Sequence, residues 1–208
     1  MVNMDEKEKT QRTRSSPALQ WHLSDENRSK VPWEIVLCGD LTDRQADLLD
    51  RLTEVPPRSR GILYFDSCGG SVYTGLALAT LIRTRQLKVT AVVIGECSSA
   101  ALLPFAACAP RFVTRQATLL FHPMRWQSEE DVRLEEATEW ARHFKHLEGD
   151  LDQILVKLLP LELSALHRWT RPGRFVTGQE IADVGLATLF DPFDTGDPWT
   201  RIRSASKA

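Results

Sequence analysis

The order of apolar runs and helix-forming stretches between residues 33 and 94 restricts the possible folds most. Three apolar runs with the length of strands alternate with two stretches whose apolar residues have helical spacing. Thr42 and Gln45 have the spacing of a capping box ahead of the first of these stretches. The expected elements are strands over Trp33–Gly39, Gly61–Phe65 and Val89–Ile94, and helices through Leu48–Leu52 and over Val72–Arg85. Because crossover helices join parallel strands, this order predicts an α/β fold with a parallel sheet.

The sequence after residue 94 continues the same alternation. A helix is expected over Ser99–Ala107, and a strand over Ala117–Phe121. Thr177 and Glu180 again have the spacing of a capping box, which predicts a last short helix that ends near Gly185.

A long helix is expected to begin in the acidic stretch Ser128–Asp131, which has capping-box spacing and suits the positive end of a helix. Its apolar residues recur three and four positions apart as one seam: Ala137, Trp140, Phe144, Leu147, Leu151, Ile154 and Leu158. Two interpretations stay open for a helix this long. The seam packs on the core of its own domain, or part of it contacts another subunit.

Length and composition indicate one domain between two polar ends. The chain has 208 residues, and 42% of them are hydrophobic, which suffices for a substantial core. We expect a domain over residues 31–193, a polar and mobile tail over residues 1–30, and a polar tail over residues 194–208.

Charge and hydropathy argue against two classes of partner. The net charge is −2, without the basic excess typical of a protein that binds nucleic acid. No apolar run approaches the roughly 18 residues that cross a bilayer, and the first thirty residues lack the apolar segment of a secretion signal. We therefore expect a soluble, cytoplasmic protein without nucleic-acid or membrane partners.

The cysteines give no support to a metal site. Cys38, Cys68, Cys97 and Cys108 contain no CxxC pair, and they are too few for a disulfide scaffold in a chain this long. We expect small, reduced core residues, and we expect no metal or cofactor.

Three motifs carry the candidate chemistry, and the first is Gly69-Gly70 after the second strand. Adjacent glycines tolerate positive φ and let backbone N–H groups approach a ligand, as an oxyanion hole requires. The same pair is common in ordinary turns, so the motif alone is weak.

The second motif is a serine pair in the segment Gly95–Ala101, between the third strand and an apolar helix. A serine on such a turn has its hydroxyl at the positive end of the helix, and the small neighbours leave room for a substrate backbone. A plain N-cap serine favours the same position. This segment alone fits both a nucleophile and a cap.

The third motif is His122, which directly follows the strand that ends at Phe121. A histidine there can keep one ring nitrogen free to accept a proton from a serine hydroxyl, although a lone histidine is more often structural. Gly-Gly, Ser and His each follow a separate strand, and the carboxyl ends of parallel strands form a common crevice. The three motifs together therefore favour one shared site.

In whole segments the sequence resembles the proteolytic subunit of the Clp protease. Matching segments follow the order and near-spacing of that family over roughly residues 33–192: Trp33–Asp40, Ile62–Gly75, Ile94–Leu102, Ala117–Pro123 and Phe175–Leu189. The resemblance implies the ClpP fold, a crotonase-like α/β fold of repeated strand–strand–helix units with a long handle helix. The expected long helix matches the handle, which packs rings face to face in that family.

The resemblance also implies roles for single residues. The nucleophile falls on Ser99, with Ser98 as the other register, and the general base falls on His122. The oxyanion donors fall on the backbone N–H groups of Gly70 and Ala100. By the same resemblance the substrate is a peptide or unfolded protein, the protein forms a homo-oligomer that encloses its sites in rings, and an ATP-dependent unfoldase is its partner.

The sequence departs from the family pattern around the triad aspartate. Within Thr170–Phe175 the aligned position is Gly173, and Pro172 replaces a neighbour that takes part in pairing between rings in the family. The Gly-rich strand that pairs with substrate is also missing, and Pro123–Gln127 stands in its place. The triad is therefore incomplete as written.

Three functions are compatible with these residues. The first is a serine peptidase with a Ser99–His122 dyad and a backbone oxyanion hole, with Glu180 or Asp183 of the last helix as candidate acids. The second is a catalytically degenerate subunit with a structural or regulatory role in an oligomer, which Gly173 favours. The third is an acyl-CoA enzyme of the crotonase group, which shares the fold and uses backbone oxyanion donors.

Overall fold

A computed structural model describes residues 31–42, 46–127 and 131–206. The expected tail over residues 1–30 lies outside these residues, as do most of the two capping boxes expected at 42–45 and 128–131. The described strands are β1 (Trp33–Leu41), β2 (Arg60–Gly70), β3 (Lys88–Cys97), β4 (Arg111–Thr114), β5 (Thr118–Phe121), β6 (Arg174–Thr177) and β7 (Thr188–Phe190). The described helices are α2 (Ala46–Glu54), α3 (Val72–Thr84), the 3₁₀ turn η2 (Ser99–Ala101), α4 (Leu102–Ala107), α5 (Leu134–Leu158), α6 (Leu163–Thr170), α7 (Gly178–Asp183) and α8 (Pro198–Ala205).

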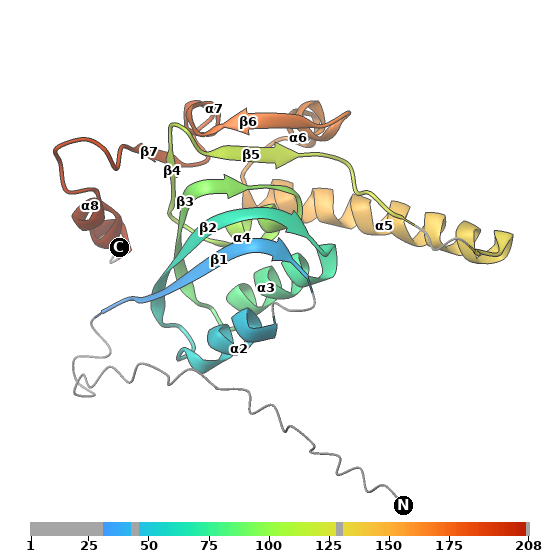
Figure 1. The fold of residues 1–208 in the computed structure, drawn as a ribbon, viewed down its shortest axis with the longest axis horizontal. Helices are drawn as coiled ribbons and strands as arrows, with labels where there is room; N and C mark the ends of the chain where they lie inside the picture. The colour runs from blue at the N-terminus through green and yellow to red at the C-terminus, as the bar shows by residue number, and fades with distance from the viewer. Residues whose placement is uncertain (1–30, 43–45, 128–130, 207–208) are drawn as a thin grey trace, which may run out of the picture. The chain divides into compact units, whose positions relative to one another are not determined.

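These strands form a mostly parallel sheet in the order β1-β2-β3-β4-β7. Strand β5 joins this sheet through a single parallel bridge, Glu96 with Thr118, and pairs antiparallel with β6. The α/β class, the parallel sheet and the long helix predicted from the sequence are thereby confirmed. Strands β1, β2, β3 and β5 end at the same edge of the sheet (Figure 1).

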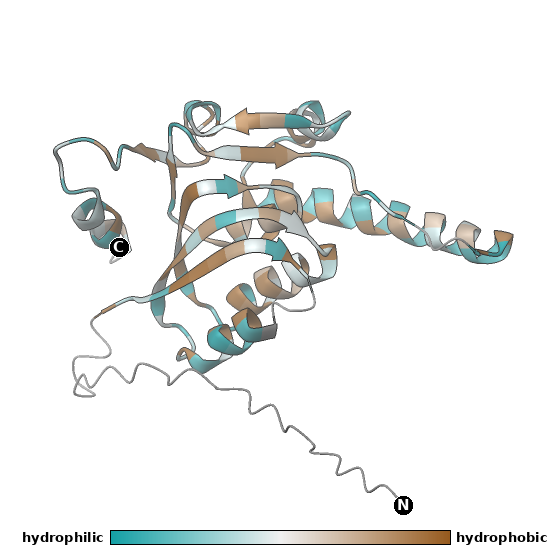
Figure 2. Cartoon of the chain, viewed as in Figure 1, coloured by the Kyte–Doolittle hydropathy of each residue, from teal (hydrophilic) through white to brown (hydrophobic). Residues whose placement is uncertain are grey.

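The main core lies between the sheet and helices α2, α3 and α4. Residues 89–93 of the central strand β3 are all buried, as expected for a strand covered on both faces. Phe65 of β2 packs edge-on against Phe105 of α4, with ring centroids 5.9 Å apart. Figure 2 shows the apolar residues concentrated in the strands and in these helices. The sheet is thus a rigid platform for the loops that follow its strands.

Helix α8 covers part of the opposite face of the sheet. Its Ile202 is 4% exposed and packs in a second buried cluster. The other buried members of that cluster are Ile62, Val92, Phe112 and Phe190. The buried hydroxyl groups of Thr90 and Ser206 lie 2.7 Å apart and form a hydrogen bond. The segment 194–208, expected only as a polar tail, therefore contains a helix that buries Ile202 against the sheet, whereas Trp199 of the same helix is exposed.

Several elements differ from the sequence-based expectations. Helix α5 begins at Leu134, and the Arg133 N–H donates to the Glu136 carboxylate, so the helix start lies beyond the acidic stretch 128–131. The short elements β4, α6, β6 and β7 were not predicted, because three to eight residues carry too little periodicity. Cys97 and Cys108 are buried as expected, whereas Cys38 and Cys68 are exposed.

The two halves of α5 have different surroundings. The inner half packs on the core through Leu151 and Leu155, both 8% exposed. The outer half, residues 134–146, is exposed or half-buried at every position, and it extends away from the sheet (Figure 1). The inner half of the seam thus packs on its own domain. The alternative interpretation, contact of the helix with another subunit, therefore applies only to the outer half.

Candidate active site

The ends of strands β2, β3 and β5 bring the three sequence motifs together at one edge of the sheet (Figure 1). Gly69 and Gly70 complete β2, Ser99 begins the turn η2 after β3, and His122 directly follows β5. Ser99 contacts both His122 and the end of β2 at Gly69, as residues at the carboxyl ends of parallel strands can.

Ser99 and His122 form a hydrogen bond. The Ser99 Oγ lies 2.8 Å from the His122 Nε2, within the range of a productive nucleophile and base. Ser99 has φ = +56°, one of three non-glycine residues with positive φ in the described part of the chain. A left-handed serine on a turn from strand to helix is a strained conformation that exposes the hydroxyl.

The second ring nitrogen of His122 settles the proton arrangement. The Nδ1 lies 2.6 Å from the backbone carbonyl oxygen of Pro123. Because a carbonyl oxygen only accepts hydrogen bonds, the Nδ1 must carry the proton and donate. In the neutral form of the ring, a proton on Nδ1 leaves the lone pair on Nε2, where it can accept the Ser99 hydroxyl.

The neighbours of Ser99 have structural roles. Ser98 is fully buried, and its hydroxyl accepts the Leu120 N–H at 3.1 Å, so it ties the turn to β5. Cys97 is also fully buried, and burial raises the pKa of its thiol well above its ordinary value. A buried neutral thiol is a poor nucleophile. Within this segment Ser99 alone reaches the histidine.

The two glycines at the end of β2 have positive φ, +93° at Gly69 and +135° at Gly70. A Cβ on Gly69 would lie 2.5 Å from the Ser99 Cβ and 2.6 Å from the Ser98 carbonyl oxygen. The missing side chain at Gly69 thus lets the β2 end lie directly against the serine turn. The sequence singled out Gly70 as the oxyanion donor and gave Gly69 no separate role.

A cavity of about 380 Å³ opens beside the serine and histidine. Ser99, His122 and the two expected oxyanion residues, Gly70 and Ala100, all line it. Helices α4 and α5 contribute apolar walls with Leu102, Leu103, Leu151 and Leu155. Ser99, His122, Gly70 and Ala100 therefore border one pocket, the arrangement that a hydrolase acting on a carbonyl requires.

The family model for Clp protease matches residues 33–189. The chain belongs to the Clp protease family. No curated protein matches the sequence. Family membership supports a ClpP-like serine peptidase that acts on peptides, in a family that typically forms oligomers. None of the described helices is both long enough and apolar enough to pass through a membrane.

The acid side of the site is where the sequence analysis expects a departure from the Clp protease pattern. At Gly173, which the sequence resemblance aligns with the family's aspartate, an added Cβ would lie 3.1 Å from the His122 Cβ. That position therefore abuts the histidine but carries no side chain. Glu180 instead accepts the Thr177 N–H at 2.9 Å and forms an ion pair with Arg174.

Asp183, the other candidate acid, accepts a hydrogen bond from the Gln179 Nε2 at 2.7 Å. Neither this carboxylate nor that of Glu180 bonds to His122 within the residues that the structure describes. The carbonyl of Pro123 thus occupies the place on Nδ1 where a triad acid would bind.

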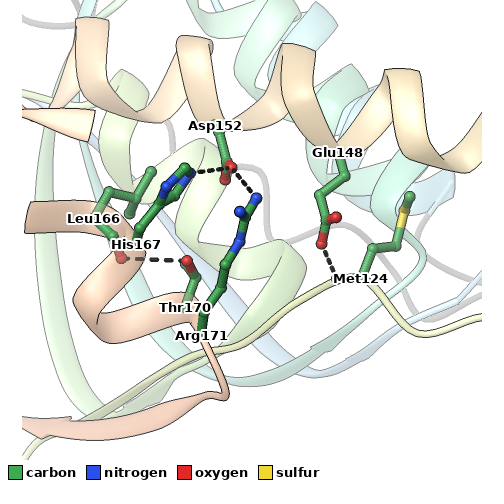
Figure 3. A network of polar contacts seen from close by, with 7 residues as sticks. All are labelled: Met124, Glu148, Asp152, Leu166, His167, Thr170 and Arg171. Carbon is green, nitrogen blue, oxygen red and sulfur yellow. Dashed lines mark hydrogen bonds and ion pairs between the residues drawn. The ribbon is translucent and has the colours of Figure 1, made fainter. Parts of the chain in front are cut away.

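A polar network at the far wall of the cavity was missed by the sequence analysis (Figure 3). The Asp152 carboxylate lies 2.9 Å from the His167 Nε2 and 3.3 Å from an Arg171 guanidinium nitrogen. Nearby, the Glu148 carboxylate accepts the Met124 N–H at 2.9 Å. The signal was two acids four positions apart beside the apolar seam of the long helix, a spacing that places them on one helix face.

Proposed function

We propose that this protein is a serine peptidase of the Clp type that cleaves peptide bonds with a Ser99–His122 dyad. The observation that carries the proposal is the 2.8 Å hydrogen bond between Ser99 Oγ and His122 Nε2 at the mouth of a cavity. The tautomer that accepts a proton at Nε2 is fixed by the Pro123 carbonyl. The family assignment supports the same class of reaction.

In the proposed reaction, Ser99 attacks the peptide carbonyl carbon while its hydroxyl proton moves to the His122 Nε2. The carbonyl π bond opens, and its electron pair becomes the oxyanion, which the N–H groups of Gly70 and Ala100 stabilise. The imidazolium then protonates the leaving amine as the C–N bond breaks. Water releases the acyl group from Ser99 by the same steps in reverse order.

The dyad is expected to work more slowly than a complete triad. The aspartate of a triad both fixes the histidine tautomer and stabilises the imidazolium, and its loss costs roughly 10⁴ in kcat where the tautomer becomes wrong. Here the Pro123 carbonyl performs the first task but brings no negative charge. We therefore expect turnover below that of a full triad, by less than this factor.

Covalent labelling tests the nucleophile directly. An active-site-directed fluorophosphonate should modify Ser99, identified by peptide mass spectrometry, and the Ser99→Ala variant should stay unlabelled. Ser98→Ala is the matched control, since Ser98 is buried and bonded to Leu120, and it should retain labelling at Ser99. Absence of labelling on the wild-type protein, or equal labelling of Ser99→Ala, would contradict the proposal.

A second candidate function is a catalytically inert subunit that keeps the fold and the assembly surface. Gly173 favours it, because the position beside His122 that the family fills with an acid is empty of any side chain. Peptidase assays on the isolated protein and on mixtures with an active family member separate the two functions. Slow turnover that disappears in Ser99→Ala would exclude the inert subunit.

We also propose a homo-oligomer that encloses the site, with contacts along the outer half of α5. Leu134 is 79% exposed and Trp126 is 42% exposed, and Trp126 packs edge-to-face against the half-buried Trp140 with ring centroids 5.0 Å apart. Exposed aromatic surface of this kind is typical of interfaces. Light scattering after size exclusion should report a multimer, and a stable monomer would contradict the assembly. The proposal of an ATP-dependent unfoldase partner is supported by the family resemblance alone.

A further inference from the structure

The wall that α5 contributes to the cavity is apolar except at two acids. Phe144, Leu151 and Leu155 line the cavity from this helix, together with Glu148 and Asp152. Carboxylates are rarely placed on an apolar wall unless they are paired or used. The two acids differ in how they are paired.

Asp152 is neutralised by its own neighbours. Its side chain is 11% exposed and accepts from both His167 and Arg171 (Figure 3). Arg171, whose side chain is 53% exposed, therefore forms an ion pair with Asp152 that offsets the two charges. This pair leaves little net charge for a ligand in the cavity.

Glu148 forms no ion pair within the part of the chain that the structure describes. Its Oε1 accepts the Met124 N–H at 2.9 Å, and its Oε2 has no hydrogen-bond partner among the residues that the structure describes. Arg125 also lines the cavity but is exposed and forms no ion pair with Glu148 in the described chain. Met124 is only two residues beyond His122, so the backbone holds this carboxylate close to the catalytic dyad.

We propose that Glu148 determines specificity, and that the cavity binds a lysine or arginine side chain of the residue whose carbonyl Ser99 attacks. This inference rests on the proposed function. The aliphatic stem of such a side chain would lie along Leu102, Leu103 and Leu151, and its cationic end would reach the Glu148 carboxylate. Long basic side chains bury their stems in this manner while their charged ends find a polar partner.

A binding experiment on the full-length Ser99→Ala variant tests the preference without any turnover. The probes are fluorescent N-acetyl tripeptide amides that end in lysine, norleucine or glutamate, and fluorescence anisotropy gives their dissociation constants. Lysine and norleucine share the same stem, so their comparison isolates the charge. We expect the lysine peptide to bind about tenfold tighter than the norleucine peptide, as for a charged hydrogen bond in a half-buried site.

The preference should disappear when Glu148→Gln is added to Ser99→Ala. Glutamine keeps an oxygen for the Met124 N–H, so the fold should persist, which unchanged thermal unfolding would verify. Glu135→Gln removes the same charge from an exposed position on the same helix and should leave the preference intact. Equal binding of lysine and norleucine peptides, tighter binding of the glutamate peptide, or a lysine preference that survives Glu148→Gln would each overturn the assignment.

The peptide-binding experiment and the labelling of Ser99 test separate proposals. If the fluorophosphonate labels Ser99 but the peptides bind without a lysine preference, the peptidase proposal stands and the role of Glu148 falls. If Ser99 stays unlabelled while the preference is present and depends on Glu148, the cavity selects basic side chains in a protein that does not cleave them.

Discussion

The two ring nitrogens of His122 have different kinds of hydrogen-bond partner, a side-chain hydroxyl on Nε2 and a backbone carbonyl on Nδ1. On the Nε2 side, the Ser99 hydroxyl lies at 2.8 Å on a strained turn that rests against Gly69. On the Nδ1 side, the partner is the carbonyl of Pro123 at 2.6 Å, and Gly173 offers no side chain. A neutral carbonyl can orient the ring but brings no charge to stabilise an imidazolium, so the proposed mechanism separates two tasks that one aspartate performs in a triad.

Removal of the base has the largest expected effect on activity. In a full triad, loss of the histidine costs about 2 × 10⁶ in kcat and loss of the aspartate alone roughly 3 × 10⁴. A dyad that works without the acid therefore has roughly 70-fold left to lose. We expect His122→Ala to lower kcat at least roughly 50-fold for a fluorogenic peptide.

His146→Ala is the control for that substitution. His146 is exposed on the outer half of α5, away from the cavity, and the variant should keep wild-type turnover. If His122→Ala kept wild-type turnover as well, the Nε2 side would have no catalytic role, and the comparison of the two sides would fail.

The close contact behind Ser99 can be broken at Gly69. In Gly69→Ala the new Cβ would need to lie 2.5 Å from the Ser99 Cβ, at φ = +93°. Gly39→Ala is matched, with φ = +77° and no atom within 4 Å of its Cβ, so it pays only the left-handed penalty of about 1–2 kcal/mol. We expect Gly69→Ala to lose more than twice that stability in urea unfolding, together with labelling of Ser99. Equal losses in the two variants would show that the contact is unimportant.

The sequence was sufficient to predict which residues meet on the nucleophile side. Ser99 and His122 each follow a strand of a parallel sheet, and such strands end at one edge, so periodicity and order alone placed the two residues together. The same reasoning placed Gly69 and Gly70 there, but it could not tell which glycine the serine turn would contact.

The partner of the His122 Nδ1 could not be predicted from the sequence, for a physical reason. The Pro123 carbonyl is a backbone group, and its direction after His122 depends on dihedral angles that residue types do not encode. The pair of Asp152 with His167 joins α5 to α6, and α6 was too short to be recognised. Ile202 carries one of few apolar side chains in a polar segment, so the burial of α8 depended on the space available on the sheet.

Replacement of Gly173 by aspartate sharpens the comparison from the acid side. The backbone there has φ = +129°, which a residue with a Cβ adopts only with strain, and the Nδ1 already donates to Pro123. We expect Gly173→Asp to raise kcat/KM less than about tenfold, far below the roughly 10⁴ that a working triad acid provides. The rates of peptide hydrolysis by the wild-type protein and by Gly173→Asp measure this change.

Gly185→Asp serves as its control, because Gly185 also has positive φ, +75°, and open space around its Cβ. Gly173→Asp should lose more stability than Gly185→Asp, because its Cβ would also lie 3.1 Å from the His122 Cβ. A gain in turnover seen only in Gly173→Asp therefore reports on the histidine and not on the fold. A gain approaching that of a complete triad would mean that the acid side needs only a carboxylate, against the geometry described above.

The smallest expected effect concerns the capping box that anchors the acid side. Strand β6 pairs with β5 and is followed by α7, whose first turn is capped by Thr177 and Glu180. The Thr177 N–H and hydroxyl, and then Arg174, lower the pKa of the Glu180 carboxyl below its ordinary value of 4.5. A carboxyl whose pKa is lower in the folded state stabilises the fold above the unfolded pKa, and this contribution is lost as the pH falls through the folded pKa.

Urea unfolding at neutral pH and at a pH of about 3 measures this contribution through the variant Glu180→Gln. The wild-type protein should lose more stability on acidification than the variant, by no more than about 1 kcal/mol, because the carboxylate is exposed and solvent screens it. Glu135→Gln, which removes an exposed acid of α5 remote from β6, should retain the wild-type slope. If Glu180→Gln followed the wild-type pH dependence, the capping box would not be what holds β6 beside His122. The pairing of β5 with β6 alone would then have to position Gly173 next to the histidine.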